Sequence, residues 1–220
     1  PLHLYCLTRK PADRARMERC GPLSTRGGFS KGGQYTPFAW FDLVDGGNAG
    51  AADEMLDATY QEMCRRLALI RDDDGDPAEW DVHHWQNLNP VVCEPLAQLT
   101  TGSPGAIYHG GLLHAAVRYF DPEAQRPGLP EGVSALVGRV SDDAITVHLA
   151  NTNLLEAREV LLQAGAFGEH AFVDATVGDS VVEVGGRHFS VRMDAATELR
   201  IALTMERHAN APTYDFPWPV

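Results

Sequence analysis

The chain has 220 residues, 44% of them hydrophobic, and a formal net charge of −12. The apolar fraction is enough for a folded core and excludes a disordered chain. The acidic excess disfavours nucleic acid, because phosphate binding needs a basic surface, and it disfavours anionic membranes for the same reason. No apolar run approaches the roughly 18 residues of a membrane span. We therefore expect a small-molecule or glycan ligand, with no nucleic acid and no membrane as a partner.

The first residues, Pro1 to Leu7, alternate like a β-strand that is already under way. Either an initiator methionine was removed or the chain is a fragment, and the missing N-terminal part of a longer chain would then be a further partner. A free N-terminal proline on a first strand also resembles the catalytic base of the tautomerase superfamily. That superfamily has a strand-helix-strand plan, whereas Pro11 and Gly21-Pro22 would interrupt a long helix here. A Pro1-dependent tautomerase is a further alternative.

Three segments before residue 100 have helical patterns, and a fourth is ambiguous. The segment from Pro11 to Arg19 predicts a short helix, and residues 53–70 predict the strongest one. Asn89-Pro90 is typical of a helix start, with an Asn cap and Pro at the first helical position, and Pro95 predicts a kink. The run from Tyr35 to Val44 has the character of a strand or of a core helix. The strongest helix carries one apolar stripe at spacings of three and four: Met55, Leu56, Thr59, Tyr60, Met63, Leu67 and Ile70.

The second half of the chain predicts an antiparallel β-sandwich. Residues 121–132 are rich in Pro and Gly and read as a linker, so we place a helical and loop-rich portion at 1–129 and a sandwich with an extended aromatic tail at 130–220. About six or seven short strands follow Val133. Gly185-Gly186, between two alternating runs, predicts a two-residue hairpin turn. The expected fold class is α+β, with a helical, irregular N-terminal portion packed on a C-terminal antiparallel β-sandwich.

The tail after residue 210 carries Tyr214, Phe216 and Trp218 at a spacing of two. In an extended segment this spacing places all three rings on one side. We expect them to dock between the helical portion and the sandwich, against the aromatic residues Phe38, Trp40 or Phe41.

The densest group of reactive side chains lies in residues 81–87, and a second group starts at residue 108. Imidazoles titrate near neutral pH and suit general acid–base chemistry. We expect His83 or His84 to be the acid or base, with Asp81 orienting it. The predicted substrate-binding residues are Trp85 and Tyr108 as flat platforms for a sugar ring, His109 beside them, and Arg118 as an anion or hydroxyl contact. The competing interpretation is that these histidines are partly buried and bonded to backbone carbonyls.

Metal and cofactor motifs are absent from the sequence. Neither HExxH nor HxH occurs, and the four cysteines form no CxxC pair. We expect no metal and no cofactor. We interpret His148, Glu169, His170 and His188, on or beside predicted strands, as surface positions of the sandwich.

Three segments of the second half carry a family resemblance. Residues 147–153, 156–163 and 198–205 combine an asparagine after a strand, a charged turn and an apolar strand. They resemble accessory sandwiches of glycoside hydrolases. The order of parts resembles the C-terminal end of carbohydrate-active enzymes that join a helical toroid to an antiparallel β-sandwich. The resemblance implies association with a glycan-active protein and transfers no catalytic residue.

These observations give a leading function and one alternative from another class. The leading hypothesis is the C-terminal portion of a carbohydrate-active protein, hydrolase or lyase in type, with the His/Trp/Tyr cluster near the domain junction. The alternative is a non-catalytic scaffold or interaction module.

Overall fold

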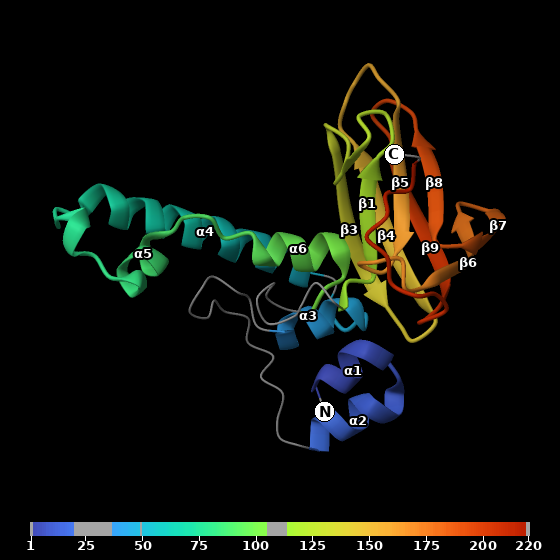
Figure 1. Ribbon diagram of the computed structural model, residues 1–220, viewed down its shortest axis with the longest axis horizontal. Coiled ribbons are helices and arrows are strands. Elements are labelled where there is room, and N and C mark those ends of the chain that lie inside the picture. The colour runs from blue at the N-terminus through green and yellow to red at the C-terminus, as the bar shows by residue number, and fades with distance from the viewer. Residues whose placement is uncertain (1, 20–36, 49, 105–113, 219–220) are drawn as a thin grey trace.

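The structure is a computed structural model that describes residues 2–19, 37–48, 50–104 and 114–218. Helices occupy the first part of the chain and strands the second (Figure 1). The helices are α1 (Leu2–Thr8), α2 (Pro11–Arg19), α3 (Pro37–Val44), α4 (Ala51–Asp72), the short 3₁₀ helix η1 (Pro77–Glu79), α5 (Val82–Leu88) and α6 (Glu94–Thr101). The strands are β1 (Val117–Asp121), β2 (Arg126–Pro127), β3 (Val133–Val140), β4 (Ala144–Asn151), β5 (Arg158–Ala164), β6 (Ala171–Val177), β7 (Ser180–Gly186), β8 (His188–Met193) and β9 (Glu198–Glu206).

The strands form two antiparallel sheets. One has the order β2-β1-β5-β8 and the other the order β3-β4-β9-β6-β7. Alternation along β4 explains why the sheets face each other: Ile145, Val147 and Leu149 are buried, whereas His148 between them is exposed. The predicted class, α+β with a C-terminal β-sandwich, is confirmed.

Helices and sandwich share one hydrophobic core. Tyr5, Trp40 and Met55 from the helices belong to the same buried cluster as Val147 and Leu203 from the sheet. A buried cation reinforces this junction. The Arg9 guanidinium pairs with Asp45 at 2.7 Å, donates to the Val140 carbonyl and lies over the Tyr5 ring. The two parts are therefore joined by buried contacts, and the junction is rigidly packed.

The expected division at residue 129 is misplaced. β1 and β2 precede it, yet both belong to the four-stranded sheet, and β1 pairs with β5. The Pro- and Gly-rich segment that we interpreted as a linker holds the β1–β2 turn and the connection to β3, so it lies inside the sandwich. Seven strands follow Val133, in agreement with the six or seven predicted.

The predicted hairpin at Gly185-Gly186 is wrong. β7 pairs with β6 and β8 pairs with β5, so the chain crosses from one sheet to the other at these glycines. The tight two-residue turn is instead the one between Val177 and Ser180, where Gly178 has a φ of 59°. Sequence alternation on both sides of Gly185 is the same for a hairpin and for a crossing between sheets, and only pairing distinguishes them.

Two local predictions at the N-terminal side also change. Residues 2–8 form a helix and not the strand that the tautomerase interpretation requires, and Pro1 lies outside the described residues. Asn89 does not start a helix. It follows the end of α5, and α6 begins at Glu94 with Pro95 in its first turn, where proline needs no amide hydrogen. The predicted helices at Pro11–Arg19 and at residues 53–70 are confirmed as α2 and α4.

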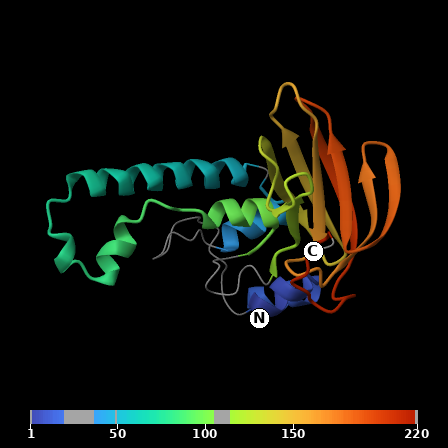
Figure 2. The same ribbon diagram turned by 45° about the horizontal axis from the view of Figure 1, so that its top comes forward.

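The segment from α4 through α5 projects from the body of the molecule, as Figures 1 and 2 show from two directions. We call residues 51–88 the arm. The buried side of α4 carries Met55, Thr59 and Arg66. The Arg66 guanidinium bonds to Glu62 and to the carbonyl of Asn89, which fixes the returning chain against α4.

The aromatic tail contacts the sandwich instead of the space between the two portions. The Tyr214 ring lies 5.2 Å from that of Phe167, and Trp218 stands edge-on to Phe120 of β1 at 5.6 Å. Trp40 and Phe41 are buried in the shared core, and the side chain of Phe38 lies outside the described residues. The expected docking against Trp40 or Phe41 is therefore not the one observed for Tyr214 and Trp218.

Candidate functional site

The structure brings together four predicted site residues at the outer end of the arm. We call this group the tip cluster: Asp81, His83, His84 and Trp85. Asp81 is the N-cap of α5, and its carboxylate accepts hydrogen bonds from the backbone amides of His83 and His84, both at 2.9 Å. The His83 ring lies 3.4 Å from the same carboxylate and is otherwise exposed.

Two aromatic contacts and one further carboxylate order the tip. The His84 ring nitrogen Nε2 lies 2.7 Å from Asp73, and Trp80 packs against both the His84 ring at 4.4 Å and Trp85 at 4.8 Å. A hydrogen bond from the backbone amide of Gly75 and, next, one from the His84 ring lower the pKa of Asp73. His84 is thus held in place, whereas His83 and the half-exposed Trp85 face solvent.

The remaining predicted residues do not join this cluster. Arg118 lies on β1 in the sandwich, with its guanidinium over the Phe120 ring, at the opposite end of the molecule from α5 (Figure 1). Tyr108 and His109 lie outside the described residues. The expected position near the domain junction is also incorrect, because the arm carries the tip cluster away from the sandwich.

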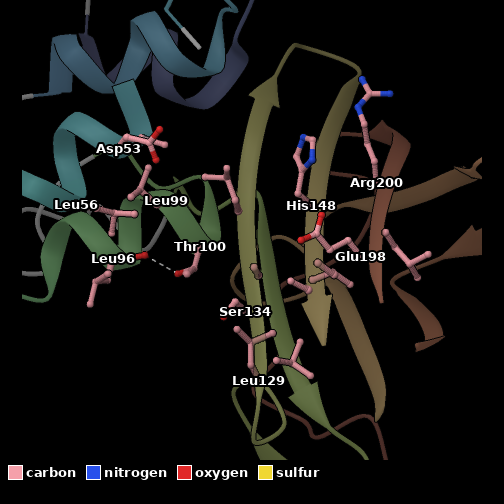
Figure 3. Close-up of a pocket in the computed structure, with 17 residues that line it drawn as sticks. Asp53, Leu56, Leu96, Leu99, Thr100, Leu129, Ser134, His148, Glu198 and Arg200 are labelled. Atoms are coloured by element: carbon pink, nitrogen blue, oxygen red, sulfur yellow. Dashed lines mark hydrogen bonds between the residues drawn. The ribbon is translucent and has the colours of Figure 1, made fainter. Parts of the chain in front are cut away.

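A cavity of about 780 Å³ does lie at the junction. We call it the junction groove. It opens between the first turns of α4, helix α6 and the outer face of the five-stranded sheet, and Figure 3 shows its two walls. Its size falls within the usual range for ligand pockets. The helical wall and the β2–β3 connection are apolar: Leu56, Leu96, Leu99 and Leu129.

The opposite wall of the groove is polar, and strand register explains which side chains meet there. His148 of β4 pairs with Arg200 of β9, and Ala150 pairs with Glu198 in the next row. Side chains at these positions leave the outer face of the sheet, so His148, Glu198 and Arg200 gather on it. Asp53 lies across the groove, in the first turn of α4 (Figure 3). Within the described residues, these four side chains form no hydrogen bond or ion pair with protein groups.

The imidazole of His148 packs against Gly138, which has no side chain to displace it. Gly138 lies at a bulge in the β3–β4 pairing, and a Cβ atom there would approach the His148 Nε2 to 3.2 Å. Partial burial and, next, the Arg200 guanidinium lower the pKa of His148, while Glu198 opposes the shift. The ring is therefore neutral at pH 7 and offers one donor and one acceptor to a ligand.

A second hollow of about 320 Å³ continues along the same face of the sheet. It shares Glu198, Leu199 and Arg200 with the junction groove and reaches Thr176 of β6. Glu198 and Arg200 therefore form a charged ridge between two depressions. Neither hollow is lined by Trp85.

Comparison with known families gives a match to the first part of the chain. Residues 1–97 match a family described only as a domain of unknown function, DUF8034. The match spans α1 to α5 and ends within α6, so it covers the helical part and none of the sandwich. No curated protein matches the chain.

Two further observations concern membrane helices and metal sites. No helix in the described ranges is long and apolar enough to cross a membrane. In the same ranges, no three His, Cys, Asp or Glu side chains are arranged to hold a metal ion.

The groove residues Glu198 and Arg200 were missed by the sequence analysis, and His148 was placed only as a surface position. Alternation in residues 198–206 does mark Glu198 and Arg200 as outward-facing. What the alternation cannot give is the register that sets Arg200 beside His148, or the helix that turns an open sheet face into a groove.

Proposed function

We propose that this chain is the C-terminal portion of a carbohydrate-active protein, hydrolase or lyase in type, and that the junction groove holds its glycan ligand. The observation that supports the proposal most is a set of polar side chains that line the groove without a protein partner. His148, Glu198 and Arg200 stand on the sheet wall, and Asp53 stands on the helical wall. Charged side chains in a hollow that have no protein partner are available to a hydroxyl-rich molecule.

The chemistry of the groove matches a sugar on both walls. Carboxylates of Asp53 and Glu198 accept hydrogen bonds from hydroxyls, the Arg200 guanidinium donates them, and neutral His148 does both. The leucines of the other wall suit the apolar faces of a pyranose ring. Carboxylates beside a neutral imidazole are also the groups that general acid–base cleavage of a glycosidic bond needs.

The tip cluster gives this proposal a second element. His83 with Asp81 remains the predicted acid–base pair, and the exposed Trp85 is an aromatic platform of the kind that the groove lacks. The tip lies at the far end of the arm, so within one chain it serves a different part of an extended glycan from the groove.

Binding of a panel of defined oligosaccharides, measured by calorimetry, tests the proposal. Arg200→Ala and Glu198→Gln should each weaken binding at least about tenfold, a loss of about 1.4 kcal/mol per site. Arg192→Ala on β8 and Glu183→Gln on β7 are matched controls, because both residues are exposed outside the groove. Unchanged affinity in the groove variants, or equal losses in the controls, would remove the groove from the proposal.

Turnover tests the tip separately. If His83→Ala, His84→Ala and Trp85→Ala all leave glycan binding and cleavage unchanged, the tip cluster has no part in the activity. The alternative, a non-catalytic interaction module, is favoured by a different observation: α4 exposes a continuous apolar stripe to solvent.

A further inference from the structure

Five apolar side chains form an exposed seam along α4: Leu56, Tyr60, Met63, Leu67 and Ile70. Their spacings are four, three, four and three residues, which is the heptad pattern of a helix that pairs with another helix. Each is at least 36% exposed, and Tyr60 reaches 70%. From Tyr60 to Ile70, every seam side chain therefore presents apolar surface to solvent.

The seam is separate from the side of α4 that packs within the chain. Met55, Thr59 and Arg66 are buried, and each directly precedes a seam residue. They therefore lie about 100° around the helix from the seam. A second helix can therefore approach the seam without displacing α5, α6 or the Asn89 carbonyl that Arg66 holds. The projection of the arm, visible in Figures 1 and 2, leaves room for such an approach.

We propose that the seam pairs with α4 of a second copy of this chain, with the two helices antiparallel. The flanking charges select both the partner and the direction. One flank carries Asp57, Cys64 and Arg71, each directly after a seam residue. In an antiparallel pair this flank meets the same flank of the other copy. Asp57 of each copy then lies beside Arg71 of the other.

A parallel pair would lack the Asp57–Arg71 pairing, because each flank would then meet the opposite flank of the partner. The Arg66 guanidinium does not decide the direction, since it is buried against Glu62 and the Asn89 carbonyl of its own chain in either case. The flanks therefore complement themselves only in the antiparallel direction.

The charge pairing also fixes the register. With Asp57 beside Arg71, Tyr60 is level with Ile70 of the second copy and Met63 is level with Leu67. The second helix ends near Ala58 and does not reach Leu56, which lines the junction groove. Self-association is thus independent of the proposed glycan ligand, and the two proposals can fail separately.

Sedimentation equilibrium of the full chain tests the association. The expected particle has twice the 24.0 kDa mass of the chain. Leu67→Glu should raise the dimer dissociation constant by about 100-fold or more, because a carboxylate would be buried in an apolar seam. Leu69→Glu is the matched control: Leu69 lies on the same helix, is 41% exposed and stands off the seam. A chain that is monomeric at high concentration, or equal effects of both variants, would overturn the proposal.

A charge exchange tests the direction of the pair. Arg71→Asp should weaken an antiparallel dimer, because two acids would then face each other, and the double variant Asp57→Arg with Arg71→Asp should restore it. The same charge change in the sandwich, Arg192→Asp, should have little effect. Tighter association of Arg71→Asp would indicate a parallel pair and would overturn the proposed direction.

Cys64 provides a positional check, because the register sets it beside Cys64 of the second copy. Cys64 is an exposed free thiol. A short bis-maleimide should link two chains in the native protein and in Cys93→Ser, and should fail in Cys64→Ser. Linkage that persists in Cys64→Ser would show that the two copies do not meet along α4.

Discussion

The sandwich buries most of its apolar side chains, whereas the arm leaves an apolar stripe exposed to solvent. In the sandwich, strands β4, β6 and β9 turn apolar side chains into the core, and Phe172, Ile201 and Leu203 have no exposure at all. In the arm, α4 has the same amphipathic character but buries only the side that meets α6 and the Asn89 segment. Its other apolar stripe is open to solvent.

This difference assigns different tasks to the two regions. Burying apolar surface stabilises a protein by about 25 cal/mol per Å², so the sandwich and the helices packed on it supply most of the folding free energy. An exposed apolar stripe gains nothing until another surface covers it, and stripes of this kind mark interaction sites. The core that includes Trp40 and Met55 joins the two regions at one end of the arm only.

The largest expected effect separates core from arm directly. Phe172→Ala should lower the free energy of unfolding by about 3 to 5 kcal/mol, because it leaves a cavity at a fully buried position of β6. Tyr60→Ala in the arm should change it by less than about 0.5 kcal/mol, as expected for an exposed site. Urea denaturation of dilute protein measures both. Similar losses in the two variants would show that the arm contributes to stability as the sandwich does.

A pH titration of stability gives the next contrast, between two histidines. Burial and then the charge of Arg207 lower the pKa of His170 to about 3, and its Nδ1 accepts a hydrogen bond from the backbone amide of His208. The folded state therefore resists protonation of His170, while the unfolded state titrates near 6.5. The contribution of neutral His170 to the free energy of unfolding is fully present above about pH 6.5. It falls on acidification toward pH 3, by at most about 1.4 kcal/mol per pH unit.

The matched variants are His170→Asn, whose side chain can still accept a hydrogen bond, and His83→Ala in the arm. His170→Asn should flatten the pH dependence between about pH 6.5 and 5, before most carboxylates titrate. His83→Ala should keep it, because His83 is exposed. An unchanged slope in His170→Asn would place the acid sensitivity elsewhere.

Two glycines extend the contrast to the backbone. Gly165 follows β5 with a φ of 84°, and a Cβ atom there would clash with the carboxyl group of Glu169. Glu169 cannot move freely, since it accepts hydrogen bonds from the amides of Ala166 and Phe167. Gly165→Ala should therefore cost about 2 kcal/mol or more. Gly75 in the arm does not have a left-handed φ, and a Cβ atom there would meet the half-buried side chains of Asp73 and Trp80 at 3.0 Å. Gly75→Ala should therefore cost less than about 1 kcal/mol in the same denaturation measurement.

The same division explains what could be predicted from the sequence. Helix α4 was predictable because its periodicity is local, and the β-sandwich was predictable because short alternating strands recur after Val133. The hairpin at Gly185 and the boundary at residue 129 failed for one reason: both depend on which strands pair. Local alternation fixes the face of a side chain but leaves the neighbouring strand undetermined.

The candidate site followed the same rule. Asp81, His83 and His84 come together because they are neighbours in sequence at the N-terminus of one helix. Such a local group is evident from the sequence. Arg118 is separated from them by more than thirty residues and lies in a different layer of the molecule. The groove residues His148 and Arg200 are 52 positions apart and meet only through the β4–β9 register.

The smallest expected effect concerns the cap of α5. The Asp81 carboxylate accepts two backbone hydrogen bonds at the start of a seven-residue helix, and these bonds lower the pKa of Asp81. Asp81→Ala removes both bonds and should cost α5 about 1 kcal/mol, whereas Asp81→Ser keeps a capping oxygen and should behave like the native chain. Because the arm meets the core at its other end only, the loss should remain local.

Amide hydrogen exchange measures this directly. In Asp81→Ala, exchange should accelerate in Val82–Leu88 while the sandwich strands and the global unfolding transition stay unchanged. A lowered global transition with accelerated exchange in β4 and β9 would mean that the arm unfolds together with the sandwich. That result would reject the division of tasks between the two regions, because the exposed stripe of α4 would then belong to the cooperative core and could not be a separate interaction surface.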